Sequence, residues 1–90
     1  MSESKNDTHA EIIRWISENR YGDPVEINPD TSIIARNLLD SMDLLRLIGF
    51  LEDTYDIIID PELLVPENFE TVRHIAGLIE RLKQQLNPAQ

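Results

Sequence analysis

The residues best placed to do chemistry are Asp40, Ser41 and Asp43, which precede an apolar run from Leu44 to Leu51. A serine hydroxyl becomes a nucleophile when a neighbouring base removes its proton, and nothing near Ser41 in the sequence is suited to that role. A serine at the start of a helix can be exposed while its backbone is ordered. We therefore interpret Ser41 as an attachment point that other proteins reach and modify.

The start of a helix suits a negatively charged group on Ser41. The first backbone N–H groups of a helix have no intrahelical partner, and the positive end of the helix dipole lies there. A phosphodiester on Ser41 would lie in a favourable field. We expect Asp40 to be the N-cap, with Ser41 held outward. Asp43, one turn further on, also suits the dipole.

Other kinds of site fit the sequence poorly. The acidic stretch from Asp53 to Glu62 lacks the glycine and the ligand spacing of a calcium loop. His9 and His74 have no further histidine or cysteine at ligand spacing, so we expect no metal site. A triad of Ser41, His74 and an aspartate would need a G-x-S-x-G turn, which is absent. We therefore do not expect a hydrolase.

Length and composition set the class of protein. Ninety residues allow one domain with one small core, and the absence of cysteine excludes disulfides and thiolate zinc sites. The polar segment 1–7 has no apolar stretch of the kind that a secretory signal needs, so we expect a cytoplasmic protein. The apolar run 44–51 contains Arg46 and is far shorter than the ~20 residues that span a bilayer.

The chain is strongly acidic. Seventeen acidic residues against eight basic ones give a formal charge of −9. Such a surface repels phosphate backbones and anionic lipids, so we expect no binding to nucleic acid or membranes. The charge either favours partners with basic patches or only keeps a small monomer soluble, and the sequence leaves both interpretations open.

The hydrophobic pattern predicts three longer helices. The first begins near Thr8, with Glu11 at capping-box spacing, and ends at residues 21–24, which include a glycine and a proline. The second runs from about residue 41 to residue 55, and the last from residue 71 to about residue 86.

The second helix is predicted to have a core face and an outer face. At ~100° per residue the core face contains Leu44, Ile48, Leu51 and Tyr55, with Leu45 beside them. The residues predicted on or near the outer face are Met42, Asp43, Arg46, Gly49, Phe50 and Asp53. The last helix is expected to bury Val72, Ile75, Ala76, Ile79, Leu82 and Leu86.

Two segments connect these helices. The long connection 24–39 is expected to pack across the bundle and leads directly to Ser41. Residues 57–59 form an extended link with Ile57 and Ile59 inward, followed by short-helix starts at Pro61 and Pro66. Leu63, Leu64 and Phe69 are expected to face the core. We predict an all-α fold, a small four-helix bundle with a long first loop, in which 8–86 is the domain and 1–7 and 87–90 are flexible ends.

The sequence around Ser41 resembles a known modification site. Asp40-Ser41-Met42 is similar to the Asp-Ser-Leu site of acyl carrier proteins, and the similarity extends from about Thr8 to Leu86. It includes Asp30-Thr31-Ser32, Phe50-Leu51-Glu52-x-x-Tyr55 and the segment from Pro66 to Val72.

This resemblance implies that Ser41 carries a 4′-phosphopantetheine arm, transferred covalently from coenzyme A by a phosphopantetheinyl transferase. Acyl or aminoacyl cargo would be held on the arm as a thioester. The chain would then be a carrier and not an enzyme, served by an adenylating ligase and by downstream acyl-processing enzymes.

The departures from the family pattern point to a dedicated pathway. Met42 replaces the usual leucine, and no glycine stands just before Leu39. Segments 38–41 and 66–69 look more like free-standing D-alanyl, aminoacyl or peptidyl carriers. Arg46 lies where fatty-acid-synthesis carriers are acidic. The resemblance therefore favours a carrier for one pathway of lipid or secondary-metabolite biosynthesis.

The second helix, together with the short helix, is the expected partner surface. Met42 and Phe50 would supply apolar contacts, and Asp43, Arg46 and Asp53 would supply charge. The alternatives are scattered surface residues of no special role, and an acidic helical adaptor that is never modified. A further hypothesis places folded-back cargo near Leu45, Ile48, Phe69 and Ile75.

Overall fold

The computed structural model describes residues 5–20 and 25–86, and within these ranges the chain is helical and has no strand. Its elements are α1 (Lys5–Asn19), α2 (Ser41–Tyr55), the 3-10 helix η1 (Pro61–Leu63), α3 (Pro66–Phe69) and α4 (Val72–Leu86). The predicted all-α bundle of three longer helices with a short helical segment is confirmed. No helix in the described ranges is long and apolar enough to cross a membrane.

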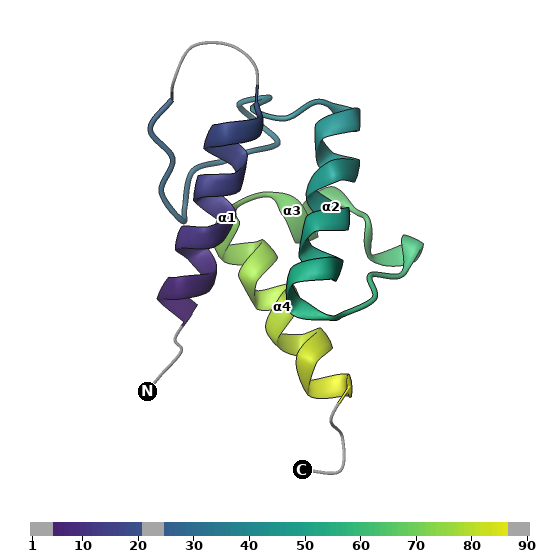
Figure 1. Ribbon diagram of the computed structural model, residues 1–90. Helices are drawn as coiled ribbons and strands as arrows, with labels where there is room; N and C mark the ends of the chain where they lie inside the picture. The colour runs from purple at the N-terminus through teal and green to yellow at the C-terminus, as the bar shows by residue number, and fades with distance from the viewer. Residues whose placement is uncertain (1–4, 21–24, 87–90) are drawn as a thin grey trace.

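The three longer helices pack around one core. α1 and α2 lie side by side with opposite chain directions, and α4 crosses behind them (Figure 1). α4 contacts α1, α2 and α3. The centre of the core contains Ile12, Ile16, Leu47, Leu51, Ile75 and Ile79, none of which is exposed to solvent. Burial of each such side chain contributes about 1.5–3 kcal/mol to folding.

α1 begins one turn earlier than predicted. Thr8 is buried inside the helix, which starts at Lys5, so the predicted capping box of Thr8 and Glu11 is wrong. The Glu11 carboxylate instead accepts a hydrogen bond from the Tyr55 hydroxyl, which joins α1 to α2. The predicted end at residues 21–24 lies outside the described residues, and α1 ends at Asn19.

The buried face of α2 is rotated relative to the prediction. Leu47 is fully buried, whereas Leu45, predicted beside the core, is 59% exposed. Asp43, predicted on the outer side, is buried. The reason is that α1 packs along the side of α2 that carries Phe50, so the buried face turns toward that side.

The link after α2 is confirmed as extended, with alternating burial. Ile57 and Ile59 are buried and Ile58 is 72% exposed. Asp56 ends α2 in the left-handed conformation, with φ of 56°. The Glu52 carboxylate then accepts a hydrogen bond from the Ile59 N–H at 2.9 Å, which holds the link against the end of its own helix.

Both predicted short-helix starts form helical turns, at Pro61 and at Pro66. Phe69 is buried as expected and Leu63 is partly buried, but Leu64 is exposed, so its predicted core position is wrong. Successive residues of a 3-10 turn lie about 120° apart, so Leu63 and Leu64 cannot both face the core.

α4 buries the five predicted residues from Val72 to Leu82, while the side chain of Leu86 lies outside the described part. Leu78, which the prediction omitted, is also buried. α4 is contacted by α1, α2 and α3. Its buried face is therefore wider than the face that a single neighbouring helix would cover.

We expect Tyr55 to make stability depend on pH in the alkaline range. Burial and the hydrogen bond to Glu11 raise the pKa of Tyr55 well above its usual 10.0. Above about pH 10 the unfolded chain loses this proton and the folded chain keeps it, so the free energy of unfolding falls as pH rises. Urea unfolding from about pH 9 to about pH 11 should show a shallower fall for Tyr55→Phe than for the parent. Tyr21 titrates in both chains and cannot account for a difference between them. Equal pH dependence of the two chains would therefore contradict the raised pKa of Tyr55.

Candidate functional site

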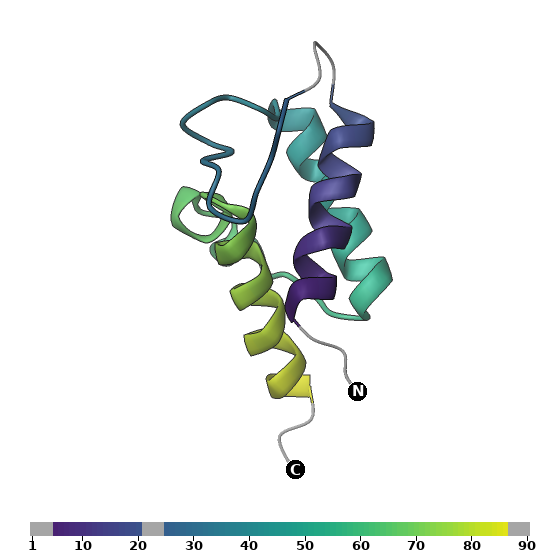
Figure 2. The same cartoon turned by 90° about the vertical axis from the view of Figure 1, so that its left-hand side faces the viewer.

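The long first loop is held against the junction of α3 and α4. The Ile33 N–H donates to the Glu70 carbonyl at 2.8 Å, and the Arg73 N–H donates to the Pro29 carbonyl at 2.9 Å. The Ser32 hydroxyl also donates to the Glu70 carboxylate. Figure 2 shows this loop passing beside the first turn of α4. The expectation that the loop packs across the bundle is confirmed.

An ion pair adds to this anchor at the surface. Arg73 donates from Nε and Nη2 to the two carboxylate oxygens of Asp30, at 2.7 and 2.9 Å. The guanidinium lowers the pKa of the Asp30 carboxyl below its usual value. Because both side chains are exposed, the pair contributes little to stability, and the buried side chains of the loop contribute more.

The loop stays ordered up to the start of α2. Ile33 and Leu38 are buried, and the Leu38 N–H closes a turn onto the Ile33 carbonyl at 3.0 Å. Asn37 takes the left-handed conformation within this turn, with φ of 55°. The Arg20 Nε donates to the Leu38 carbonyl at 3.2 Å, which ties the end of α1 to the same point.

Asp40 is the N-cap of α2, as predicted. Its backbone is extended, and its Oδ1 accepts a hydrogen bond from the Asp43 N–H at 2.8 Å. The Asp40 carbonyl accepts the first helical bond, from the Leu44 N–H at 2.9 Å. The N–H groups of Ser41 and Met42 are therefore left without a partner in the helix, and they lie at the positive end of the helix dipole.

Ser41 is exposed at the first position of α2, as expected. Within the described part of the chain its hydroxyl makes no hydrogen bond, so no neighbouring base is poised to remove its proton. The arrangement suits modification by another protein.

Asp43 does not lie on the outer face where the sequence placed it. Its side chain is only 6% exposed, and its Oδ1 accepts a hydrogen bond from the Arg46 Nη1 at 3.3 Å. The rotation of α2 that buries Leu47 also buries Asp43, because the two positions are four residues apart and share a face. The carboxylate is therefore covered and offers little charge to a partner.

Phe50 also differs from the prediction. Its ring is half-buried against Trp15 of α1, with ring centroids 5.7 Å apart and planes inclined by 26°. Phe50 thus faces α1 and not the outer side of α2.

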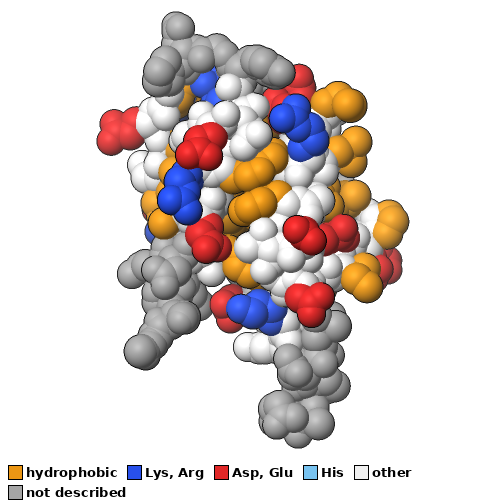
Figure 3. Space-filling model, viewed as in Figure 1, with side chains coloured by type: hydrophobic (Ala, Val, Ile, Leu, Met, Phe, Trp, Pro, Cys, Tyr) orange, Lys and Arg blue, Asp and Glu red, His pale blue; other side chains and the backbone are white. Residues whose placement is uncertain are grey.

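Exposed apolar side chains of α2 lie near Ser41, which follows the exposed N-cap Asp40. Met42 is 66% exposed and Leu45 59% exposed, and the side chain of Arg46 is half exposed. We call Ser41, Met42, Leu45 and Arg46 the serine face. Figure 3 shows hydrophobic side chains along the α2 edge of the molecule. Leu45 was not predicted on this face, although its i, i+3 spacing from Met42 was a signal.

The predicted charged residue Asp53 is exposed and lies near the other end of α2, far from Ser41. With ~1.5 Å of rise per residue, twelve residues separate the two positions by about 18 Å along the helix axis.

The structure also limits where cargo could lie. Ile48, Phe69 and Ile75 are buried in the packed core, while Leu45 opens to solvent. These four residues therefore do not line a common open site. Cargo could reach the buried three only if the core opened.

The geometry fits a phosphodiester on Ser41. An exposed hydroxyl stands at the positive end of a 15-residue helix, next to two N–H groups that the helix leaves unused. Among the described residues no group of three or more histidines, aspartates or glutamates is placed to hold a metal ion.

Comparison with known protein families matches residues 14–79 to the phosphopantetheine attachment site family. The match covers most of the chain and includes α2, the anchored loop and the first half of α4. A search of curated proteins finds no match to the chain.

We expect the Asp40 cap to stabilise the fold measurably. Asp40→Ala removes the acceptor for the Asp43 N–H and should lower the free energy of unfolding by about 0.5–2 kcal/mol in a urea titration. Asp60→Ala is the matched control, because Asp60 precedes η1 without making a side-chain cap. Its effect should stay within about 0.5 kcal/mol. Equal losses in the two variants would show that the Asp40 cap contributes nothing specific.

Proposed function

The chain belongs to the phosphopantetheine attachment site family, and we propose that Ser41 is the residue that bears the prosthetic group. The protein is accordingly a carrier with a covalently bound 4′-phosphopantetheine, and it is not itself an enzyme. When bound, the group supplies a terminal thiol that can hold an acyl or aminoacyl group as a thioester.

A comparison of the serines in the matched region supports Ser41. Residues 14–79 contain Ser17, Ser32 and Ser41. Ser17 lies inside α1, and the Ser32 hydroxyl is bonded to Glu70. Ser41 alone among the three begins a helix and has an exposed hydroxyl beside unused N–H groups. This position at the N-terminus of α2 is the observation on which the proposal rests.

The anchored loop and the cap give the attachment point a defined place. Buried Leu38 and the Asp40 cap hold the backbone on the N-terminal side of Ser41, and α2 holds it on the other side. A transferase would therefore meet a preorganised hydroxyl, with less conformational entropy lost on binding than a disordered segment would lose.

We propose that the carrier serves one biosynthetic pathway as a cytoplasmic monomer. A phosphopantetheinyl transferase would modify it, an adenylating ligase would load an acyl or aminoacyl group, and acyl-processing enzymes would receive it. Tethering keeps the cargo at a high effective concentration near each partner's active site. The formal charge of −9 supports a monomer, because two copies repel each other.

The serine face is the proposed docking surface for these partners. Exposed Met42 and Leu45 offer apolar contact, and half-exposed Arg46 offers a cation next to them. A fitting partner presents an apolar socket beside a carboxylate. Asp53 can add an acidic contact at the far end of α2, whereas buried Asp43 and the stacked Phe50 are not available there.

Coexpression with a broad-specificity phosphopantetheinyl transferase tests the attachment site. Intact mass spectrometry should show a gain of one phosphopantetheinyl group on the parent chain and none on Ser41→Ala. Ser17→Ala is the control and should be modified like the parent, because Ser17 lies inside α1 and not at the N-terminus of a helix. A parent chain that stays unmodified would favour the alternative function, an acidic helical adaptor.

A charge placed on the serine face should slow modification. Leu45→Glu would put a carboxylate into the proposed apolar contact, and we expect kcat/KM of the transferase to fall about tenfold, or about 1.4 kcal/mol. Ile58→Glu is the matched control, because Ile58 is 72% exposed but lies beyond the C-terminal end of α2. Equal rates for the two variants would place docking elsewhere.

A further inference from the structure

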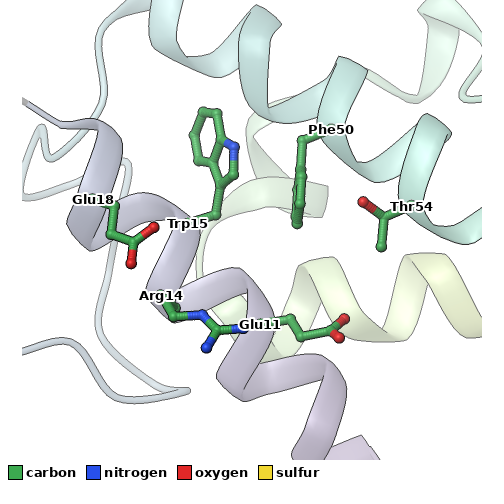
Figure 4. Close-up of a pocket in the computed structure, with 6 residues that line it drawn as sticks. All are labelled: Glu11, Arg14, Trp15, Glu18, Phe50 and Thr54. Carbon is green, nitrogen blue, oxygen red and sulfur yellow. The ribbon is translucent and has the colours of Figure 1, made fainter.

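A groove lies between α1 and α2, on the side of α2 that carries Phe50. It has a volume of about 400 Å³ and opens to solvent. Its walls are formed by Glu11, Arg14, Trp15 and Glu18 of α1 and by Phe50 and Thr54 of α2. Figure 4 shows the rings of Trp15 and Phe50 meeting from the two helices, with the polar side chains around them. Figure 3 shows hydrophobic side chains in this region between α1 and α2, with charged side chains around them.

The groove faces a different direction from Ser41. Nine residues separate Ser41 from Phe50, and at 3.6 residues per turn they lie half a turn apart around α2. A protein docked on Ser41 and Leu45 therefore leaves the groove open, whereas Arg46 lies one turn from Phe50 on the groove side of α2. The groove is also far for the carrier's own arm. Phosphopantetheine spans about fourteen bonds, roughly the length of five peptide residues or ~16 Å. The arm would use most of this length to cover the ~13.5 Å along the helix axis between Ser41 and Phe50. It would also have to pass around the helix to the other side.

The lining of the groove favours a planar cation. Trp15 and Phe50 form a stacked pair with planes inclined by 26°, and a guanidinium can extend such a stack. Glu11 and Glu18 stand on the α1 wall, one turn to either side of Arg14. The two carboxylates outnumber the one guanidinium. The Glu11 carboxylate is held in place by the Tyr55 hydroxyl, so its charge has a defined position.

We propose that this groove is a second docking site that takes an arginine side chain from a partner protein. The arginine stem would lie along Trp15 and Phe50, and its guanidinium would pair with Glu18 and Glu11. The volume suits one long side chain and not a whole helix. A second copy of the chain is a poor occupant, since each copy has a formal charge of −9. This site is independent of phosphopantetheine and goes beyond the carrier function.

N-acetyl-arginine amide is the probe for this proposal, and N-acetyl-citrulline amide is its neutral isostere. Titration into the full ¹⁵N-labelled chain should shift the amide signals of residues 11–18 of α1 and 50–54 of α2. The fluorescence of Trp15, the single tryptophan, should change in parallel. The citrulline probe should bind markedly more weakly. Ser41→Ala should bind like the parent, so the result is independent of whether Ser41 is the attachment site.

Variants separate a built site from general attraction to an acidic protein. Glu18→Gln should weaken binding of the arginine probe about threefold, as expected for an exposed charge pair. Glu26→Gln makes the same change of charge at an exposed position outside the groove and should leave binding unchanged. Arg14→Gln should tighten binding, because it removes the competing cation from the wall.

Three results would overturn the proposal. Equal losses of affinity for the arginine probe in Glu18→Gln and Glu26→Gln would show that the probe is held only by non-specific attraction to an acidic protein. Equal affinities for the citrulline and arginine probes would show that the positive charge does not contribute to binding. Shifts of the same amide signals when the chain alone is concentrated would identify a second copy as the occupant.

Discussion

The contact between the first loop and Glu70 is the constraint on which the presentation of Ser41 depends. Glu70 receives the Ile33 N–H on its carbonyl and the Ser32 hydroxyl on its carboxylate, so one residue after α3 holds the loop twice. From there the buried side chain of Leu38 and the Asp40 cap leave little freedom before α2 begins. A loop of this length would otherwise place the serine poorly, because flexible segments lose entropy whenever a partner must order them.

The orientation of α2 determines which of its side chains are exposed to partner proteins. Its buried face turns toward α1, and this single rotation has two consequences. It covers the carboxylate of Asp43, and it exposes Leu45 beside Met42 near the serine. A chain with a strongly acidic composition thus has a serine face that is apolar with one cation, Arg46. The net charge of the chain influences how fast partners approach from a distance, whereas the serine face provides the contacts once a partner has docked.

The same rotation forms the groove on the side of α2 opposite to Ser41. Phe50 moves from the expected outer face onto Trp15, and the space beside the stacked rings is lined by side chains of both helices. A four-helix carrier therefore has two surfaces that face in different directions. One surrounds the site of modification, and the other lies between α1 and α2. Both depend on how α1 packs against α2 and would change together if that packing changed.

The positions of the helices, the Asp40 cap and the exposed serine could all be predicted from the amino-acid sequence. Helical periodicity, the Asp40 signal and the alternation of Ile57, Ile58 and Ile59 are local properties, so they predicted the elements, the exposure of Ser41 and the extended link. The rotation of each helix and the start of α1 depend instead on packing between the helices. A helix with apolar residues on more than half of its circumference can bury several overlapping faces, and the neighbours it contacts select one. This is why Leu45, Asp43 and Phe50 lie where sequence periodicity did not place them.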